Sequence, residues 1–179
     1  MSHKEERDFC TSVKHKFPYS FTGKRVLEIG SGDINGNNNY LFEDCCLTRV
    51  DVCKGPNVDL ISYAHDLTFV DDLFDTVIST ECFEHDKHYV KSLKNMVRML
   101  RPGGLLLFTC ATTGRPEHGT SRSKPWQVLS TRMENSEDYY KNLTEQDIRE
   151  VIDVDKIFIE HEFSVELNHC DLFFWGIKK

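Results

Sequence analysis

The feature that most constrains the fold is an apolar run that ends in a carboxylate and two glycines, RVLEIGSGD at residues 25–33. Its aliphatic residues favour a buried strand. Gly30 and Gly32 let the backbone turn sharply and approach a ligand without interference from a Cβ atom. In open α/β sheets a cofactor binds where a parallel strand ends in such a turn. The run therefore predicts the first strand of a parallel sheet with a candidate cofactor site at its carboxyl end.

A second apolar run, residues 47–52, carries Asp51 at its end, roughly 20 residues beyond the glycines. A carboxylate at that position can accept hydrogen bonds from the two hydroxyls of a ribose. This spacing is shared by nicotinamide dehydrogenases and by methyltransferases that use S-adenosylmethionine. The dinucleotide fingerprint needs a third glycine where this chain has Asn35. The site therefore lacks a pyrophosphate cradle, which S-adenosylmethionine does not need.

Periodicity and turn residues predict the remaining elements. The turn at residues 54–57 is too short for a regular crossover helix, so the helix between strands two and three is reduced or absent. Predicted helices are 4–17, a short one from Asn35 through Phe42, 86–100 and 144–152; predicted strands are 24–29, 48–53, 58–61, 73–79, 104–110, 156–165 and 170–177.

Short motifs in a fixed order extend this pattern: DING at 33–36, TECFEH at 80–85, RPGG at 101–104 and RPEHGT at 115–120. With them the chain resembles the class I S-adenosylmethionine-dependent methyltransferases, in the small branch similar to methyltransferase type 11. The resemblance implies an α/β, Rossmann-like three-layer sandwich with a seven-stranded, mostly parallel sheet and an antiparallel last strand. It implies one methyltransferase domain over residues 1–179, with an N-terminal helix within 1–20 and a substrate-side loop at 111–142.

The resemblance also implies S-adenosyl-L-methionine as cofactor. Glu28 would act near its ammonium group, or else pair with a lysine, and Asp51 would bind the ribose, or else close a turn. The adenine element departs from the family pattern because Tyr63 stands in place of an aspartate. The predicted cofactor-binding residues are Glu28, Gly30, Ser31, Gly32, Asp51, Val52, Ala64, His65, Thr80 and Glu81.

Four residues are candidates for work on the acceptor. His85 lies four residues after Glu81 and could be a general base, or a histidine that orders the loop; both are predicted catalytic residues. Arg115 and His118 lie in a locally basic loop. They could bind an anionic group of the acceptor, or tie the loop down.

Bulk properties restrict the partners. The formal net charge of −7 argues against non-specific binding to nucleic acid. The seven cysteines show no C-x-x-C spacing, so neither a disulfide framework nor a zinc site is predicted, and no metal ligands are assigned. No apolar run is long enough for a membrane span and the charged N-terminus is no secretory signal, so we expect a cytoplasmic protein.

The favoured function is transfer of a methyl group to an oxygen or nitrogen of a small acceptor, which the basic loop suggests is anionic. An alternative is a methyltransferase-like subunit that binds or activates a partner without catalysis; the short link after strand two and Tyr63 favour it. A nicotinamide oxidoreductase is a third class, weakened by Asn35.

Overall fold

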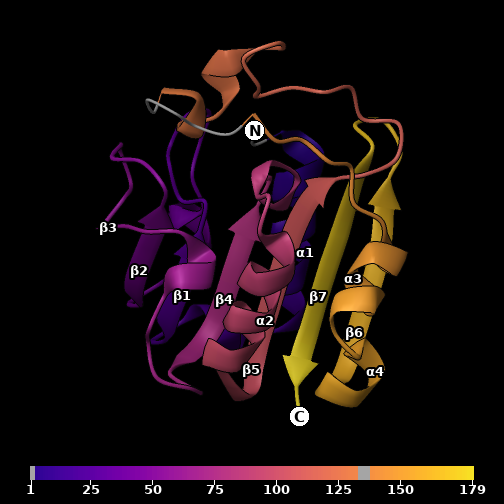
Figure 1. Cartoon of the computed structure of the whole chain (residues 1–179). Helices are drawn as coiled ribbons and strands as arrows, with labels where there is room; N and C mark the ends of the chain where they lie inside the picture. Colours follow the sequence, from indigo (N-terminus) through magenta and orange to yellow (C-terminus); the bar gives the residue numbers. More distant parts are fainter. Residues whose placement is uncertain (1–2, 133–137) are drawn as a thin grey trace.

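The computed structural model of the 179-residue chain describes residues 3–132 and 138–179. Their core is one seven-stranded sheet in the order β3-β2-β1-β4-β5-β7-β6 (Figure 1). The strands are β1 Arg25–Ile29, β2 Cys46–Asp51, β3 Leu60–Ile61, β4 Phe74–Thr80, β5 Leu100–Ala111, β6 Phe158–Glu166 and β7 Asp171–Lys178.

The five strands from β1 to β5 pair in parallel. β7 enters between β5 and β6 and is antiparallel to both, so the closing hairpin supplies one edge of the sheet. This confirms the predicted Rossmann-like methyltransferase architecture, including the antiparallel last strand. Among the described residues, no helix is long and apolar enough to cross a membrane.

Both faces of the sheet are covered because its strands are apolar on both sides. In β1, Val26 belongs to one core cluster and its neighbour Leu27 to the other, as expected for side chains that alternate across a strand. Helix α1, Lys4–Lys16, packs on the Val26 face. On the Leu27 face lie α2 Tyr89–Met99, α3 Glu145–Val151 and α4 Val154–Ile157 (Figure 1). The result is the predicted three-layer sandwich.

The first two crossovers contain no α-helix. The predicted short helix from Asn35 is wrong: only the single 3-10 turn Asn39–Leu41 forms there, because polar Asn and Gly residues precede it and offer no apolar stripe to bury. The link from β2 to β3 has no helix, as predicted. β3 is a two-residue strand that pairs Leu60 with Val50 and Ile61 with Asp51.

The described residues between β5 and α3, 112–132 and 138–144, lie at the carboxyl edge of the sheet (Figure 1). They contain two short 3-10 turns, Pro125–Gln127 and Ser130–Arg132. Helix α3 then begins at a capping box, in which the Thr144 hydroxyl accepts from the Asp147 amide and the Asp147 carboxylate accepts from the Thr144 amide. The described residues between β5 and α3 therefore lie at the edge where ligands bind in this fold class.

Candidate active site

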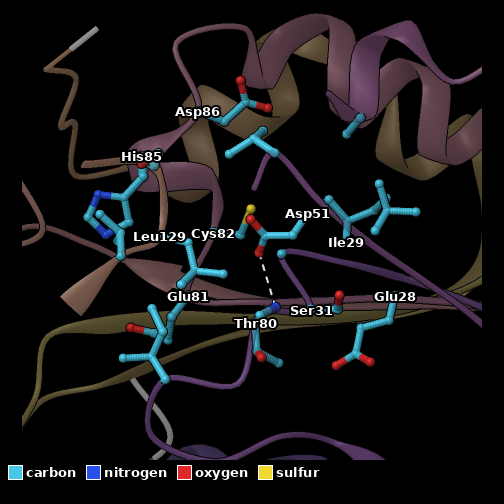
Figure 2. A pocket seen from close by; sticks show the side chains of 18 of the residues that line it. Glu28, Ile29, Ser31, Asp51, Thr80, Glu81, Cys82, His85, Asp86 and Leu129 are labelled. Atoms are coloured by element: carbon cyan, nitrogen blue, oxygen red, sulfur yellow. Dashed lines mark hydrogen bonds between the residues drawn. The ribbon is translucent and has the colours of Figure 1, made fainter. Parts of the chain in front are cut away.

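A cavity of about 490 Å³ opens at the carboxyl ends of β1, β2 and β4. Figure 2 shows acidic side chains around the cavity: Glu28 and Asp51 from β1 and β2, and Glu81 just after β4, on the same side of the view as Leu129 and His85. Arg115 and His118 are not among the described residues that line it. All predicted cofactor-binding residues do so: Glu28, Gly30, Ser31, Gly32, Asp51, Val52, Ala64, His65, Thr80 and Glu81.

The glycine turn is held beneath β2. The amides of Gly30 and Ser31 both donate to the Val50 carbonyl, at 2.9 and 3.1 Å. Gly30 has a φ of +74°, a conformation that residues with a Cβ rarely adopt, and a Cβ there would collide with Cys82. The two features explain why the turn requires glycine at position 30.

Asp51 lies directly over this turn. Its Oδ2 atom accepts a hydrogen bond from the Gly32 amide at 3.0 Å, the dashed line in Figure 2, and Oδ1 accepts from the Cys53 amide at 3.2 Å. Burial raises the pKa of the Asp51 carboxyl. Two backbone donors thus fix the carboxylate in orientation at the cavity wall, and each oxygen keeps capacity for a further donor.

Glu28 is almost fully buried, and an asparagine reaches it from the loop after the glycine turn. The Asn38 side-chain amide donates to Glu28 Oε1 at 2.9 Å and to Thr80 Oγ1 at 3.1 Å. Glu28 Oε2 has no hydrogen-bond partner among the described residues. Burial raises the pKa of Glu28 to about 7. A cation in the cavity would satisfy this carboxylate and favour its ionised form.

Asp33 shapes the loop that delivers Asn38. Its two carboxylate oxygens accept from the Gly36 amide at 3.0 Å and from the Asn37 side chain at 2.7 Å. An aspartate whose carboxylate accepts hydrogen bonds from residues just after it in the chain stabilises a tight turn without a helix. The DING motif is therefore a loop-forming element that precedes Asn38, whose side chain reaches Glu28 and Thr80.

Tyr63, Ala64 and His65 also line the cavity. The Asn95 side chain of α2 donates to the Ala64 carbonyl at 2.8 Å and fixes this 3-10 turn. The ring of His65 lies between those of Tyr63 and His88, with centroid distances of 5.4 and 4.4 Å. Tyr63 is half-exposed at the rim, so it offers a ring face to a planar ligand but no carboxylate.

Glu81 occupies a strained position just after β4. Its φ is +50°, and its amide donates to the Thr109 carbonyl at 3.0 Å. Thr109 Oγ1 donates to Glu81 Oε1 at 2.9 Å, whereas Oε2 has no hydrogen-bond partner in the described part of the chain. Burial is the main cause that raises the Glu81 pKa. Left-handed backbone in a non-glycine residue is often found at functional sites.

His85 ends a 3-10 turn, Phe83–His85, and its ring borders the cavity. The ring packs edge-on against His118, at 5.1 Å between centroids, and against Tyr140 at 5.5 Å. Burial lowers the His85 pKa to about 3. The imidazole is therefore neutral near pH 7 and weakly basic, which argues against the general-base role predicted for it.

Arg115 is not a lining residue of the cavity: it forms a buried ion pair with Asp171 of β7, and its Nη2 atom lies 3.9 Å from Oε2 of the cavity residue Glu81. Its Nη1 atom donates to the His169 carbonyl at 2.6 Å and to Asp171 Oδ1 at 3.2 Å. Asp171 is fully buried and also contacts His3 Nε2 at 2.6 Å. Arg115 was predicted either to bind an anionic acceptor or to hold the loop in place. Its contacts with His169 and Asp171 favour the second alternative.

Glu6 and Leu129 are two of the cavity residues that carried no sequence-based assignment. Glu6, from α1, is buried and lines the cavity, and burial raises its pKa to about 7. The spacing of Glu6 from Cys10 and Val13 places it on the buried face of α1. A carboxylate on the apolar face of a predicted helix is unusual, and this pattern could have identified Glu6 from the sequence. Leu129 is also buried, and a Cβ on Gly32 would overlap its side chain. Nothing in the local sequence distinguishes Leu129.

Comparisons with known sequences identify the family of the chain. The chain matches the profile of the methyltransferase domain family over residues 1–140. A fatty-acid O-methyltransferase of Mycolicibacterium smegmatis is 32% identical over 140 residues, which cover 64% of this chain and 48% of that protein. A phthiotriol/phenolphthiotriol dimycocerosates methyltransferase of Mycobacterium ulcerans is 32% identical over 102 residues, 49% of this chain and 38% of that protein. The chain thus spans less than half the length of these two relatives.

Solved structures share the fold. The 1,6-didemethyltoxoflavin N1-methyltransferase of Burkholderia thailandensis, solved with S-adenosylhomocysteine, superposes with a TM-score of 0.64 at 15% identity, covering 95% of this chain and 76% of that one. Phosphoethanolamine N-methyltransferase 2 of Haemonchus contortus, solved with S-adenosyl-L-methionine, has a TM-score of 0.64 at 19% identity, covering 96% of this chain and 52% of that one.

Proposed function

The chain belongs to the methyltransferase domain family, and from this premise we propose that it transfers a methyl group from S-adenosyl-L-methionine to an oxygen or nitrogen of a small acceptor. The related proteins above are methyltransferases by name, and two of the structures that share the fold contain S-adenosylmethionine or its demethylated product. The cofactor supplies the electrophilic methyl group, so the protein has to bind, orient and exclude water.

The charge of the cavity wall is the observation that carries the choice of cofactor. Among the described residues that line the cavity, Lys87 is the one Lys or Arg. S-adenosylmethionine carries a sulfonium and an ammonium, which an acidic wall attracts, whereas the pyrophosphate of NAD would be repelled. The acidic residues of the wall are Glu6, Glu28, Asp51, Asp66, Glu81 and Asp86.

The roles of the cofactor residues follow from their places in the cavity. Asp51, oriented by two backbone amides, would accept from the ribose hydroxyls. Glu28 would face the ammonium group, with Gly30–Gly32 passing beneath the amino-acid part. The rim residues Val52, Ala64 and His65 would border the adenine. Thr80 and Glu81 lie at the end of β4 and would border the methionine end.

The acceptor would enter on the side of Glu81 and His85. Arg115 and His118 motivated an anionic acceptor, but the cavity-lining residues do not include them and Arg115 is paired with Asp171. An acidic wall would also repel an anion. We therefore propose a neutral or cationic acceptor, with Glu81 as the group that takes its proton. Its pKa is raised, and its Oε2 atom accepts no hydrogen bond among the described residues and has Arg115 Nη2 at 3.9 Å, which suits proton transfer better than the weakly basic His85 does.

Isothermal titration calorimetry of the whole chain tests the proposed function. S-adenosylhomocysteine should bind with micromolar affinity, and NAD should not bind. Asp51→Asn is the matched variant, since it keeps the side-chain volume and one acceptor oxygen but removes the charge. Tight binding of NAD, or no binding of S-adenosylhomocysteine, would refute the proposal. Transfer of a labelled methyl group to a metabolite extract separates an enzyme from the non-catalytic subunit considered above.

A further inference from the structure

A second polar cluster lies behind the cavity wall, where the loops after β4 and β5 meet. Potential ligand atoms of Glu84, His85 and His118 lie within 4.8 Å of one another. Glu84 Oε1 is 3.9 Å from His85 Nε2 and 3.9 Å from His118 Nε2. These distances are too long for hydrogen bonds. The three side chains converge on one point without bonding to each other.

Glu84 is the unusual member of the cluster. Its side chain is fully buried, and neither carboxylate oxygen has a hydrogen-bond partner among the described residues. A buried carboxylate without a partner lowers the stability of the folded protein by roughly several kcal/mol unless a cation or a hydrogen-bond donor compensates its charge. The neighbours that it faces are two imidazoles, not donors at bonding distance. An absent cation between Glu84 and the imidazoles would account for this arrangement.

The tautomer of His118 is set for binding a cation. Its Nδ1 lies 3.1 Å from the Pro116 carbonyl, which can only accept, so Nδ1 carries the proton and donates. Nε2 then presents a lone pair toward Glu84. A histidine that donates from one ring nitrogen to a carbonyl and offers the other to the ion is the usual arrangement at metal sites.

The backbone brings the two imidazoles together at a glycine. Gly119 has a φ of +63°, and a Cβ at this position would lie 2.7 Å from His85 Cε1. Only a residue without a side chain lets the loop after β5 approach His85 this closely. Tyr140 packs against both imidazoles and donates to the Pro116 carbonyl at 3.2 Å. The cluster is thus supported on several sides.

We propose that Glu84, His85 and His118 bind one divalent transition-metal cation, with a coordination position open to the cavity that His85 lines. Two imidazole nitrogens and one carboxylate suit Zn²⁺, Co²⁺ or Mn²⁺. Two ligands of one such ion lie about 3.4 Å apart, so the observed 3.9 Å needs small side-chain movements only. Three protein ligands leave a position for water or substrate.

The open position defines the acceptor class, an inference that rests on the proposed methyl transfer. An ion there would bind a hydroxyl of the acceptor and lower its pKa. The hydroxyl proton would pass to the Glu81 carboxylate. The oxygen would then form a bond to the methyl carbon as the carbon–sulfur bond breaks, and its electron pair would stay on sulfur. The cluster therefore favours O-methylation of a hydroxyl compound.

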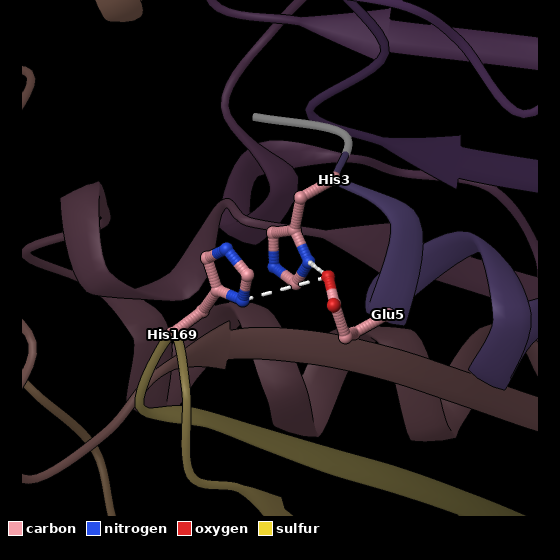
Figure 3. Close-up of side chains that lie close together, drawn as sticks. All are labelled: His3, Glu5 and His169. Carbon is pink, nitrogen blue, oxygen red and sulfur yellow. Dashed lines mark hydrogen bonds and ion pairs between the residues drawn. The ribbon is translucent and has the colours of Figure 1, made fainter.

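The cluster of Figure 3 provides a control. His3, Glu5 and His169 also offer close ligand atoms, and Glu5 Oε2 lies 3.2 Å from His3 Nδ1 and 3.5 Å from His169 Nδ1. These side chains are less buried, their rings stack at 4.1 Å, and they are bonded to one another. The polar atoms of these side chains are partners of one another, so this cluster does not call for an ion.

Cobalt titration of the metal-stripped whole chain tests the proposal, with the visible absorption of bound Co²⁺ as readout. One Co²⁺ per chain should bind, Glu84→Gln and His118→Gln should weaken binding at least tenfold, and His169→Gln should leave it unchanged. Azide should shift the Co²⁺ spectrum if a position is open. The site is refuted if Co²⁺ does not bind, if it binds equally to all variants, or if binding is lost only in His169→Gln. If azide does not change the Co²⁺ spectrum, the proposed role of the ion toward the acceptor is refuted.

Two further measurements keep the outcome decisive. If the buried variants do not fold, as judged by circular dichroism, pulsed electron spin resonance of Mn²⁺ bound to the wild type must still show two imidazole nitrogens; one or none contradicts the site. Calorimetry with S-adenosylhomocysteine needs no metal. Loss of cofactor binding with intact Co²⁺ binding would remove the methyl transfer and leave the ion site, and the reverse result would remove the ion site alone.

Discussion

Replacing Glu28 by glutamine should change how the stability of the protein depends on pH. Glu28 is 2% exposed, and its pKa is about 7 in the folded state against 4.5 for an ordinary glutamate. Glutamine keeps the volume of the side chain and an oxygen that can accept from Asn38 Nδ2, as Glu28 Oε1 does at 2.9 Å. The substitution therefore removes the titration with little change in packing.

The sign of the effect follows from proton binding. Between pH 4.5 and about 7 the folded state holds a proton on Glu28 that the unfolded chain has lost. Stability of the wild type therefore falls as the pH rises through this interval, and the loss is complete above pH 7. The interval corresponds to about 3 kcal/mol, at about 1.36 kcal/mol per pH unit. Glu28→Gln should be free of this loss.

Urea unfolding at several pH values between 4.5 and 8.5 measures the difference. The free energy of unfolding of Glu28→Gln, relative to wild type, should rise by about 3 kcal/mol from pH 4.5 to 8. Glu117 is a suitable control, because bonds from Thr120 and Arg122 lower its pKa and Glu117→Gln should show the opposite trend. Parallel pH profiles for wild type and Glu28→Gln would show that burial does not perturb this carboxyl.

Three other substitutions test separate parts of the structure. Asp51→Ala should weaken binding of S-adenosylhomocysteine by about 2–3 kcal/mol in calorimetry, since it removes a charged acceptor; unchanged affinity would exclude the ribose role. Arg115→Met should lower the free energy of unfolding by about 3–5 kcal/mol, because it removes the arginine partner of the buried Asp171 carboxylate, which keeps its contact with His3, whereas the exposed Arg122→Met should cost under about 1 kcal/mol. Equal effects would contradict the buried tie. Gly32→Ala should lower both the affinity for the cofactor and the melting temperature, because the new Cβ overlaps the Leu129 side chain. A variant that behaves as wild type would mean that the segment carrying Leu129 moves to make room without cost.

Much of the fold was predictable because it depends on local patterns. The apolar runs of β1, β4 and β5 are buried on both faces, which parallel strands between helices require. The short link after β2 excluded a crossover helix on length alone. The short helix after Asn35 was predicted in error, because the polar Asn and Gly residues there offer no apolar stripe to bury. The hydrogen bonds from Gly36 and Asn37 to Asp33, which hold the loop instead, are seen only in the structure.

The meeting of Asp51 and the glycine turn at one cavity was predictable for a related reason. Asp51 and the glycine turn follow neighbouring parallel strands, so their meeting is a consequence of strand register, Ile29 beside Val50. Once the strands are recognised, covalent spacing places these residues at one edge of the sheet. The sequence by itself thus determined that a sheet forms, that its central strands run parallel, and which residues lie at its carboxyl edge.

Tertiary structure alone decided what the other polar side chains do. Arg115 and His118 are three residues apart in one basic loop, yet Arg115 pairs with Asp171 in β7 and His118 faces Glu84 after β4. Glu6 reaches the cavity from the first helix. These partners lie far apart in the chain, and their approach depends on how loops pack over the sheet. Burial then raises the pKa of Glu6 and Glu84 and lowers that of His118, which no local spacing of residues can specify.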